Sequence, residues 1–145
     1  MGEYGPQAVK AFEQKLAELK NVGIEVAADN TPDDQGTAGI TITFSDGTVL
    51  AGAYWRLIHD GRAVLSSFDH KKRYGLPAPI DAKEQIARLL ARRICQNVQF
   101  DRVTADLILV FDGTTKLQVF NFTAFEMWAL RFPDGTGEYS NYALE

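Results

Sequence analysis

The sequence has little of the residues on which most small-protein chemistry depends, with one cysteine and two histidines among 145 residues. A lone Cys95 excludes an intramolecular disulfide and fits a reducing cytosol. No apolar run approaches the roughly 20 residues that a membrane-spanning helix needs. The first residues lack the apolar core of a signal peptide. We therefore expect a cytoplasmic protein that does not engage a membrane.

The familiar motifs of catalysis and metal binding are also missing, including G-x-S-x-G, H-E-x-x-H, C-x-x-C and a phosphate-cradling glycine loop. Residues 29–34 hint at a calcium loop, but Asp34 stands where glycine is required and no terminal Glu follows. For Cys95 a small, partly buried thiol is favoured over a nucleophile. We expect no catalytic residues, no metal and no cofactor, and hence a protein that is not an enzyme.

The composition itself is that of an ordinary globular chain, with 46% hydrophobic and 23% charged residues. It predicts a single domain over residues 1–145. A chain of this length can bury roughly two-thirds of its unfolded surface, so its core needs no metal or disulfide. The final Leu144-Glu145 fits a native end or a vector-derived one equally well.

Two segments carry apolar residues at helical spacing. The first helix is predicted over residues 6–20, after the start signal Gly5-Pro6. The second is predicted over residues 82–96, with Asp81 as its N-cap. Loops rich in Pro, Gly, Asp or Lys are predicted over residues 29–39 and 69–80.

The remaining segments are short and apolar or alternating, and Asp-Gly pairs, which favour hairpin turns, separate several of them. The run Leu107–Phe111 is apolar throughout, which predicts a strand covered on both faces. The other predicted strands are residues 24–26, 40–44, 48–58, 62–68, 116–122 and 126–132, with a last edge segment near Tyr139.

The two halves of the chain resemble each other in the order of these features. The turn at Asp46-Gly47-Thr48 matches Asp112-Gly113-Thr114, and Trp55 matches Trp128. We predict an α+β fold of two pseudo-repeated helix-plus-four-strand antiparallel meander units, at residues 6–68 and 82–140, with both helices packed on the sheet. Two unrelated meanders with ordinary turns remain the alternative.

Two interpretations apply to the matched tryptophans. Trp55 and Trp128 precede Leu57 and Leu130 by two positions, and residues at that spacing share one face of a strand. The favoured interpretation is that both rings pack in the core beneath the helices. The alternative is an aromatic pair that lines a ligand groove.

Residues 116–122 predict a strand with apolar side chains on both faces. Leu117 and Val119 lie on one face, and Phe120 and Phe122 lie on the other. Two helices can cover only one side of such a sheet, which leaves sheet curvature, a second sheet or another protein as the second cover. Of these, we expect the Phe face to bind another protein or a second copy of the chain.

Charge is concentrated in one region. Residues 69–93 carry seven Lys or Arg and three Asp or Glu, in a chain whose net charge is −4. Arg88 and Arg92 are one turn apart and are predicted to share a helical face. The overall negative charge argues against binding nucleic acid. The candidate binding residues are Phe120, Phe122, His70, Arg73, Tyr74, Arg88 and Arg92, with His70 interpreted as a solvated loop residue.

The closing pattern Leu117-x-Val119-Phe120-Asn121, then Glu126-x-Trp128-x-Leu130, then Asp134-Gly135, resembles the end of small bacterial proteins of unknown function. Some of these are similar to immunity proteins of polymorphic toxin systems. The resemblance is confined to the C-terminal part of the chain and assigns no contact residues. It implies a cytosolic protein that binds another protein and catalyses nothing.

Two functions from different classes follow. The preferred hypothesis is a non-catalytic protein-binding module of a bacterial cytosol, immunity-like or forming a homodimer. The alternative is a small-molecule-binding protein or enzyme that uses a groove between the two halves, near His70, Arg73, Tyr74 and the tryptophans. A pocket of roughly several hundred Å³ with convergent polar groups would favour the alternative, and a broad apolar patch would favour protein binding.

Overall fold

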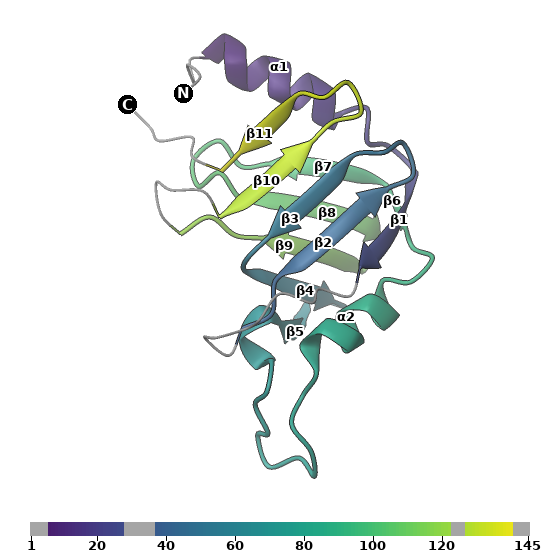
Figure 1. Ribbon diagram of the computed structural model, residues 1–145, viewed down its shortest axis with the longest axis vertical. Helices are drawn as coiled ribbons and strands as arrows, with labels where there is room; N and C mark the ends of the chain where they lie inside the picture. The colour runs from purple at the N-terminus through teal and green to yellow at the C-terminus, as the bar shows by residue number, and fades with distance from the viewer. Residues whose placement is uncertain (1–5, 28–36, 123–126, 141–145) are drawn as a thin grey trace.

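The computed structural model describes residues 6–27, 37–122 and 127–140, and these form an α+β fold with antiparallel sheets, as predicted. Helix α1 (Pro6–Leu16) lies at one end of the molecule and α2 (Ala82–Leu89) at the other (Figure 1). None of the helices described is long and apolar enough to cross a membrane. The start signal at Gly5, residues 29–36 of the predicted loop and Leu144-Glu145 lie outside the described residues.

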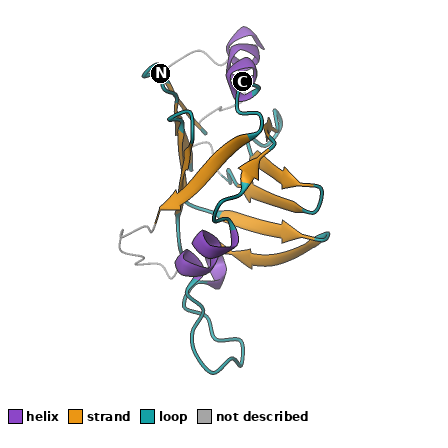
Figure 2. Ribbon diagram, turned by 90° about the vertical axis from the view of Figure 1, so that its right-hand side faces the viewer, coloured by secondary structure: helices purple, strands orange, loops and turns teal. Residues whose placement is uncertain are grey.

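The strands form two sheets where the sequence predicts one. A six-stranded sheet has the order β11-β10-β3-β2-β1-β6, and a five-stranded sheet has the order β5-β4-β9-β8-β7. One sheet lies in front of the other, and their inward side chains form one core (Figures 1 and 2). The strands are β1 (Val22–Ala27), β2 (Ile40–Phe44), β3 (Val49–Gly52), β4 (Trp55–His59), β5 (Arg62–Ser66), β6 (Ile94–Cys95), β7 (Asn97–Phe100), β8 (Leu107–Asp112), β9 (Thr115–Val119), β10 (Trp128–Arg131) and β11 (Gly137–Tyr139).

The prediction of one sheet is wrong because the chain crosses between the sheets where an unbroken strand was expected. Residues 48–58 form β3 in one sheet and β4 in the other, and the break falls at Ala53 and Tyr54. The corresponding crossing in the second half joins β9 to β10, and these two connections are here called the chain crossings. The chain also changes sheet between β5 and β6 and between β6 and β7. The first half therefore has five strands and the second half, counting β6, has six, instead of four each.

Both helices end earlier than predicted, at Leu16 and Leu89 instead of residues 20 and 96. Asn21 and Arg92 have φ angles of 56° and 60°, in the left-handed region that turns a chain out of a helix. The residues after Arg92 then pair with β1 as β6. Pairing with a sheet edge thus overrides the helical spacing that runs through Ile94.

Corresponding strands of the two halves pair in corresponding registers. Apart from β6, the six-stranded sheet contains β1–β3 of the first half and β10–β11 of the second, and the five-stranded sheet contains β7–β9 of the second half and β4–β5 of the first. This correspondence favours the pseudo-repeat, which stays a prediction. The matched pairs are Ile40↔Gly52 with Leu107↔Val119, Ile42↔Leu50 with Leu109↔Leu117, and Leu57↔Leu65 with Leu130↔Glu138.

The two tryptophans are core residues, which confirms the core position that the favoured interpretation gives them. Trp55 and Trp128 are fully or almost fully buried. The indole N–H of Trp55 donates to the Ala38 carbonyl at 2.7 Å, and that of Trp128 donates to the Ala105 carbonyl at 2.7 Å. Phe12 of α1 stacks on Trp128 with 5.9 Å between ring centroids. Neither ring is available to line a ligand groove.

Replacing Trp128 should therefore weaken the fold. We expect Trp128→Ala to lower the free energy of unfolding by about 3–5 kcal/mol, because it leaves a large cavity in the core. Trp128→Phe should cost less, since it keeps a ring and removes only the indole N–H. Urea unfolding followed by circular dichroism measures both, and a loss below about 1 kcal/mol for Trp128→Ala would contradict the burial of the ring.

The two sheets approach each other closely at Gly52, the last residue of β3. A Cβ at Gly52 would lie 2.7 Å from Cγ1 of Val119, the last residue of β9 in the other sheet. That distance is shorter than a carbon–carbon contact allows, so only glycine fits without movement. Gly52 is thus required by the packing of the sheets and not by a turn.

The substitution Gly52→Ala should lower the free energy of unfolding by about 1–3 kcal/mol through overpacking. The same substitution should cost less in a Val119→Ala background, which removes the atom that the new methyl group meets. A double-mutant cycle measures this coupling. Equal costs in the two backgrounds would show that the sheets do not meet at these residues.

Candidate functional site

Four aromatic side chains form a cluster on the surface, here called the aromatic surface: Tyr54, Phe68, Phe120 and Phe122. Tyr54 stacks on Phe68 at 5.2 Å between centroids and touches Phe122 at 5.3 Å. Phe122 in turn stacks on Phe120 at 5.7 Å. Phe68 and Phe122 remain 47% and 57% exposed, so the cluster presents ring surface to solvent.

The chain crossings between the sheets position this surface. The N–H of Phe120 donates to the Tyr54 carbonyl at 2.9 Å, and the N–H of Ala53 donates to the Met127 carbonyl at 3.0 Å. Each crossing therefore donates one backbone hydrogen bond to the other. Trp55 points into the core, whereas its neighbour Tyr54 is only half-buried and contacts Phe68 and Phe122.

Phe68 reaches the surface through a short 3-10 turn, η1 (Ser67–Asp69), that follows the edge strand β5. The side chain of Ser66 accepts from the N–H of Phe68, and the Asp69 carboxylate accepts from the N–H of Ser66, which together form a capping box. The turn is held by its own hydrogen bonds, which places Phe68 without help from a partner.

A cation lies against the cluster. The Arg56 guanidinium carbon is 5.1 Å from the Phe120 ring centroid, a cation–π contact. Its Nε donates to Oε1 of Gln118 at 2.7 Å, which fixes the side chain in place. None of the described carboxylates forms an ion pair with Arg56, so its positive charge is not neutralised within the described part of the chain.

The sequence placed Phe120 and Phe122 opposite Leu117 and Val119, and the structure agrees. Leu117 and Val119 are completely buried, whereas Phe120 is half-buried and Phe122 is exposed. Tyr54 and Phe68 were missed. Strand alternation from Trp55 contains the signal for Tyr54, but Phe68 lies in a turn whose direction no local pattern predicts.

The outer face of the five-stranded sheet continues as a mixed apolar surface. Leu107, Leu109 and Phe111 of β8 are buried, but Ile108 and Val110 are only half-buried. The prediction that β8 is covered on both faces is therefore wrong. A strand whose residues are all apolar can therefore have one buried face and one face that is only partly covered.

The candidate residues of the loop at 69–80 do not join the aromatic surface. His70 is only 7% exposed, and its Nδ1 accepts from the N–H of Ala82 at the start of α2 at 3.1 Å. It is a buried loop residue that contacts the start of α2, so the interpretation of a solvated loop histidine is wrong. Arg73 donates to the Pro77 carbonyl, and the Tyr74 hydroxyl donates to Asp69, which raises the pKa of Tyr74.

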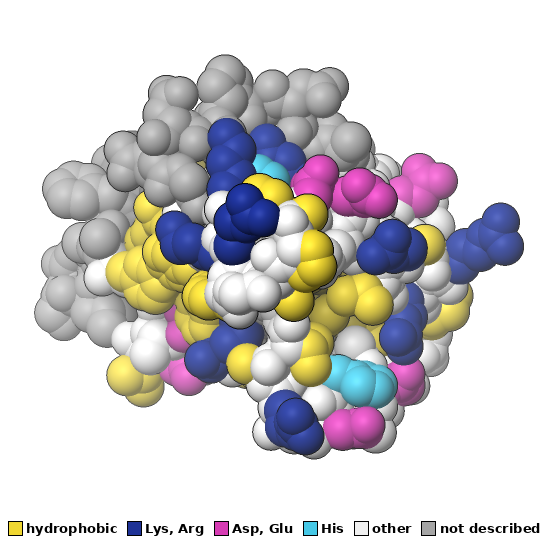
Figure 3. All heavy atoms as spheres, turned by 90° about the horizontal axis from the view of Figure 1, so that it is seen from below, with side chains coloured by type: hydrophobic (Ala, Val, Ile, Leu, Met, Phe, Trp, Pro, Cys, Tyr) yellow, Lys and Arg dark blue, Asp and Glu magenta, His cyan; other side chains and the backbone are white. Residues whose placement is uncertain are grey.

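Arg88 and Arg92 do not share a helical face, because α2 ends before Arg92. Arg88 lies 3.6 Å from Glu84 one turn earlier. Arg92 makes no hydrogen bond or ion pair with the described residues. This end of the molecule shows basic side chains among exposed hydrophobic ones (Figure 3).

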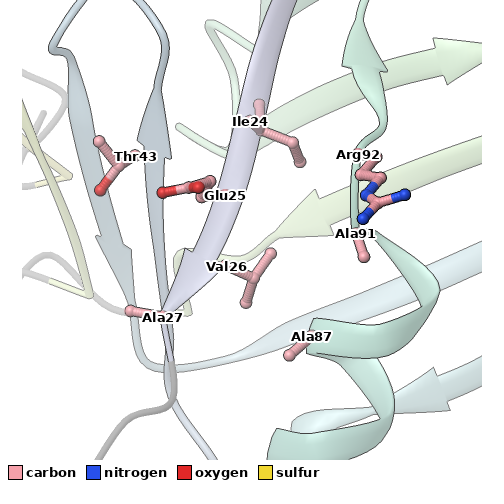
Figure 4. Close-up of a pocket in the computed structure, with 8 residues that line it drawn as sticks. All are labelled: Ile24, Glu25, Val26, Ala27, Thr43, Ala87, Ala91 and Arg92. Carbon is pink, nitrogen blue, oxygen red and sulfur yellow. The ribbon is translucent and has the colours of Figure 1, made fainter.

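Arg92 instead lines a cleft of about 590 Å³ between β1 and α2 (Figure 4). The cleft thus lies between the first half of the chain and the second, where the sequence allows for a groove. His70, Arg73, Tyr74 and the tryptophans do not line it. Its walls are Ile24, Glu25, Val26, Ala27, Thr43, Ala87, Ala91 and Arg92.

The described residues offer little for catalysis. They contain no group of three or more His, Cys, Asp or Glu side chains that could hold a metal ion. The carboxylates with strongly lowered pKa values belong to turns. Hydrogen bonds from Thr114 lower the pKa of Asp112 to about 2, and a hydrogen bond from Lys15 lowers that of Asp134. Both stabilise turns as ionised acceptors and are poorly suited to proton transfer near neutral pH.

Cys95 is a strand residue of β6 and is completely buried. Burial raises the pKa of its thiol to about 12, so the reactive thiolate is scarce near neutral pH. Its Sγ lies 3.3 Å from the Asn97 carbonyl oxygen, to which it can donate.

Comparison of the chain with protein-family models, curated protein sequences and solved structures finds no match.

The buried thiol leads to a simple reactivity prediction. At about pH 8, iodoacetamide should leave Cys95 unmodified in the folded protein. In about 6 M guanidinium, which unfolds most domains, it should alkylate Cys95 fully. Intact mass spectrometry measures both. Rapid alkylation of the folded protein would contradict the burial of Cys95 and reopen its interpretation as a nucleophile.

Proposed function

We propose that this chain is a non-catalytic protein-binding module and that the aromatic surface is where its partner protein binds. The observation that carries the proposal is the exposure of Phe68 and Phe122 in a cluster of four touching rings. Aromatic residues and arginine are enriched at protein interfaces, and exposed apolar patches usually mark one. An immunity-like role and a second copy of the chain are both specific forms of this function.

The geometry supports a preformed contact. The rings are held by the chain crossings and by the η1 turn, so binding need not order them first, which favours affinity. Arg56, which lacks a carboxylate partner among the described residues, suits a partner that brings an acidic side chain to the rim of the rings.

The test compares Phe68→Ser and Phe122→Ser, singly and together, with the control Val103→Ser. Val103 is 78% exposed and lies in the loop between β7 and β8, so it matches the loss of exposed apolar surface elsewhere. Partner proteins from cells that encode the chain are captured on the wild-type protein. Each partner is then purified, and its affinity for the variants is measured by titration. We expect the double variant to bind at least about tenfold more weakly and Val103→Ser to bind as wild type.

Light scattering at micromolar concentration tests a second copy as the partner. A dimer mass for wild type and Val103→Ser, with a monomer mass for the double variant, would identify self-association through this surface. The proposal is overturned if wild type is monomeric and captures no protein, or if the double variant keeps the affinity of wild type.

A further inference from the structure

The outer edge of β1 is only partly paired. β6 pairs with Val22 and Gly23, and the N–H of Ile24 donates to the Arg93 carbonyl at 3.2 Å. Alternate residues of a strand direct their backbone groups to the same edge, so Val26 faces the side that Ile24 faces. Past Ile24, no described residue pairs with that edge of β1. The N–H and C=O of Val26 are therefore open to the cleft.

Helix α2 forms the opposite wall of the cleft at a distance that leaves room. It contributes Ala87, and Ala91 and Arg92 follow just beyond its end, so the side chains opposite β1 are two methyl groups and one guanidinium (Figure 4). The volume of about 590 Å³ is within the range of roughly 300–1,000 Å³ typical of ligand sites. An open strand edge beside a helix with small side chains can receive one further strand.

The fold does not require this opening. The strand that corresponds to β1 in the other half is β7, and α1 packs beside it. There Phe12 meets Phe100 edge to face at 5.2 Å, and Glu13 holds Arg102 through two hydrogen bonds. The large side chain of Phe12 fills the space beside β7, whereas helix α2 presents only a small alanine side chain to the corresponding space beside β1.

Charge indicates the chemistry of the occupant. Arg92 lines the cleft without a hydrogen bond or ion pair to the described residues. The one acidic residue of the lining is Glu25, which points away from α2 toward Thr43 (Figure 4). A carboxylate brought by a ligand would find a cation that the chain itself leaves without a partner.

We propose that the cleft between β1 and α2 binds an extended peptide segment of another protein by strand addition, with a peptide carboxylate at Arg92. The peptide backbone pairs with Val26 and extends the six-stranded sheet beyond β1, in line with β6. A small peptide side chain packs on Ala87 and Ala91. The site is separate from the aromatic surface and goes beyond the proposed function.

The probe is a phage-displayed library of random heptapeptides, selected on the wild-type chain and synthesised for titration. We expect the selected peptides to carry an Asp, a Glu or a free C-terminus at one shared position. Arg92→Gln should weaken binding at least about tenfold, through loss of a charge-assisted hydrogen bond. The control Arg88→Gln removes an equal charge that does not line the cleft and should bind as wild type.

Two variants and one spectroscopic readout separate this site from others. Ala91→Phe should abolish binding by filling the cleft at an exposed position, and Phe122→Ser should leave binding unchanged. Hydrogen exchange at the Val26 amide should slow at least about tenfold when peptide binds, because the amide gains a partner. Amidating the peptide C-terminus distinguishes a terminal carboxylate from an acidic side chain.

The proposal is overturned if no acidic peptide is selected, if Ala91→Phe binds as wild type, or if the Val26 amide is already protected in the free protein. Loss of peptide binding in Phe122→Ser would also overturn it and would assign the peptide to the aromatic surface. Failure here leaves the partner protein of the aromatic surface unaffected, so the two proposals stand or fall separately.

Discussion

The close approach of the two sheets at the chain crossings is the constraint on which the rest of the structure depends. The chain can pass from β3 to β4 beside β9 because Gly52 has no side chain where Val119 needs the space. After each crossing a tryptophan turns into the core and anchors its indole N–H on a carbonyl. A buried N–H without an acceptor would cost about 1–3 kcal/mol, so these two hydrogen bonds keep both rings in place.

The same constraint creates the aromatic surface. Residues at a crossing belong to neither sheet, and at the first of them Trp55 points into the core while the half-buried Tyr54 contacts Phe68 and Phe122. The backbone hydrogen bond from Phe120 to Tyr54 brings the rings of the two crossings together. The exposed cluster is therefore a consequence of how the sheets close, and its rigidity comes from the core beneath it.

Much of the fold could be predicted from the sequence, because hairpins and buried tryptophans leave local signals. The alternation in residues 40–44, the Asp-Gly turns and the spacing of Trp128 and Leu130 indicate strands that the structure contains. The division into two sheets could not be predicted, because it depends on contacts between residues far apart in sequence, such as the close approach of Gly52 to Val119. The end of α2 was missed for a similar reason: periodicity continues to Ile94, but pairing with β1 captures that residue.

The candidate sites were less predictable than the fold, since each depends on neighbours from distant segments. Phe120 and Phe122 could be found by alternation, whereas Phe68 joins them only through the η1 turn. The sequence pattern predicts Arg92 on a helical face, but the structure places it beyond the end of the helix, where it lines a cleft beside β1. Composition can indicate that a charge is present, but only tertiary structure decides what that charge faces.

The two surfaces differ in physical kind, and this difference bears on how they could act together. The aromatic surface would gain affinity mainly from burying apolar area, which depends weakly on salt. The cleft would gain it from backbone hydrogen bonds and one ion pair, and exposed charges are screened over about 10 Å at ordinary ionic strength. A partner that used both surfaces would combine a salt-insensitive contact with a salt-sensitive one. Because they arise on separate elements, one could be lost in a variant without loss of the other.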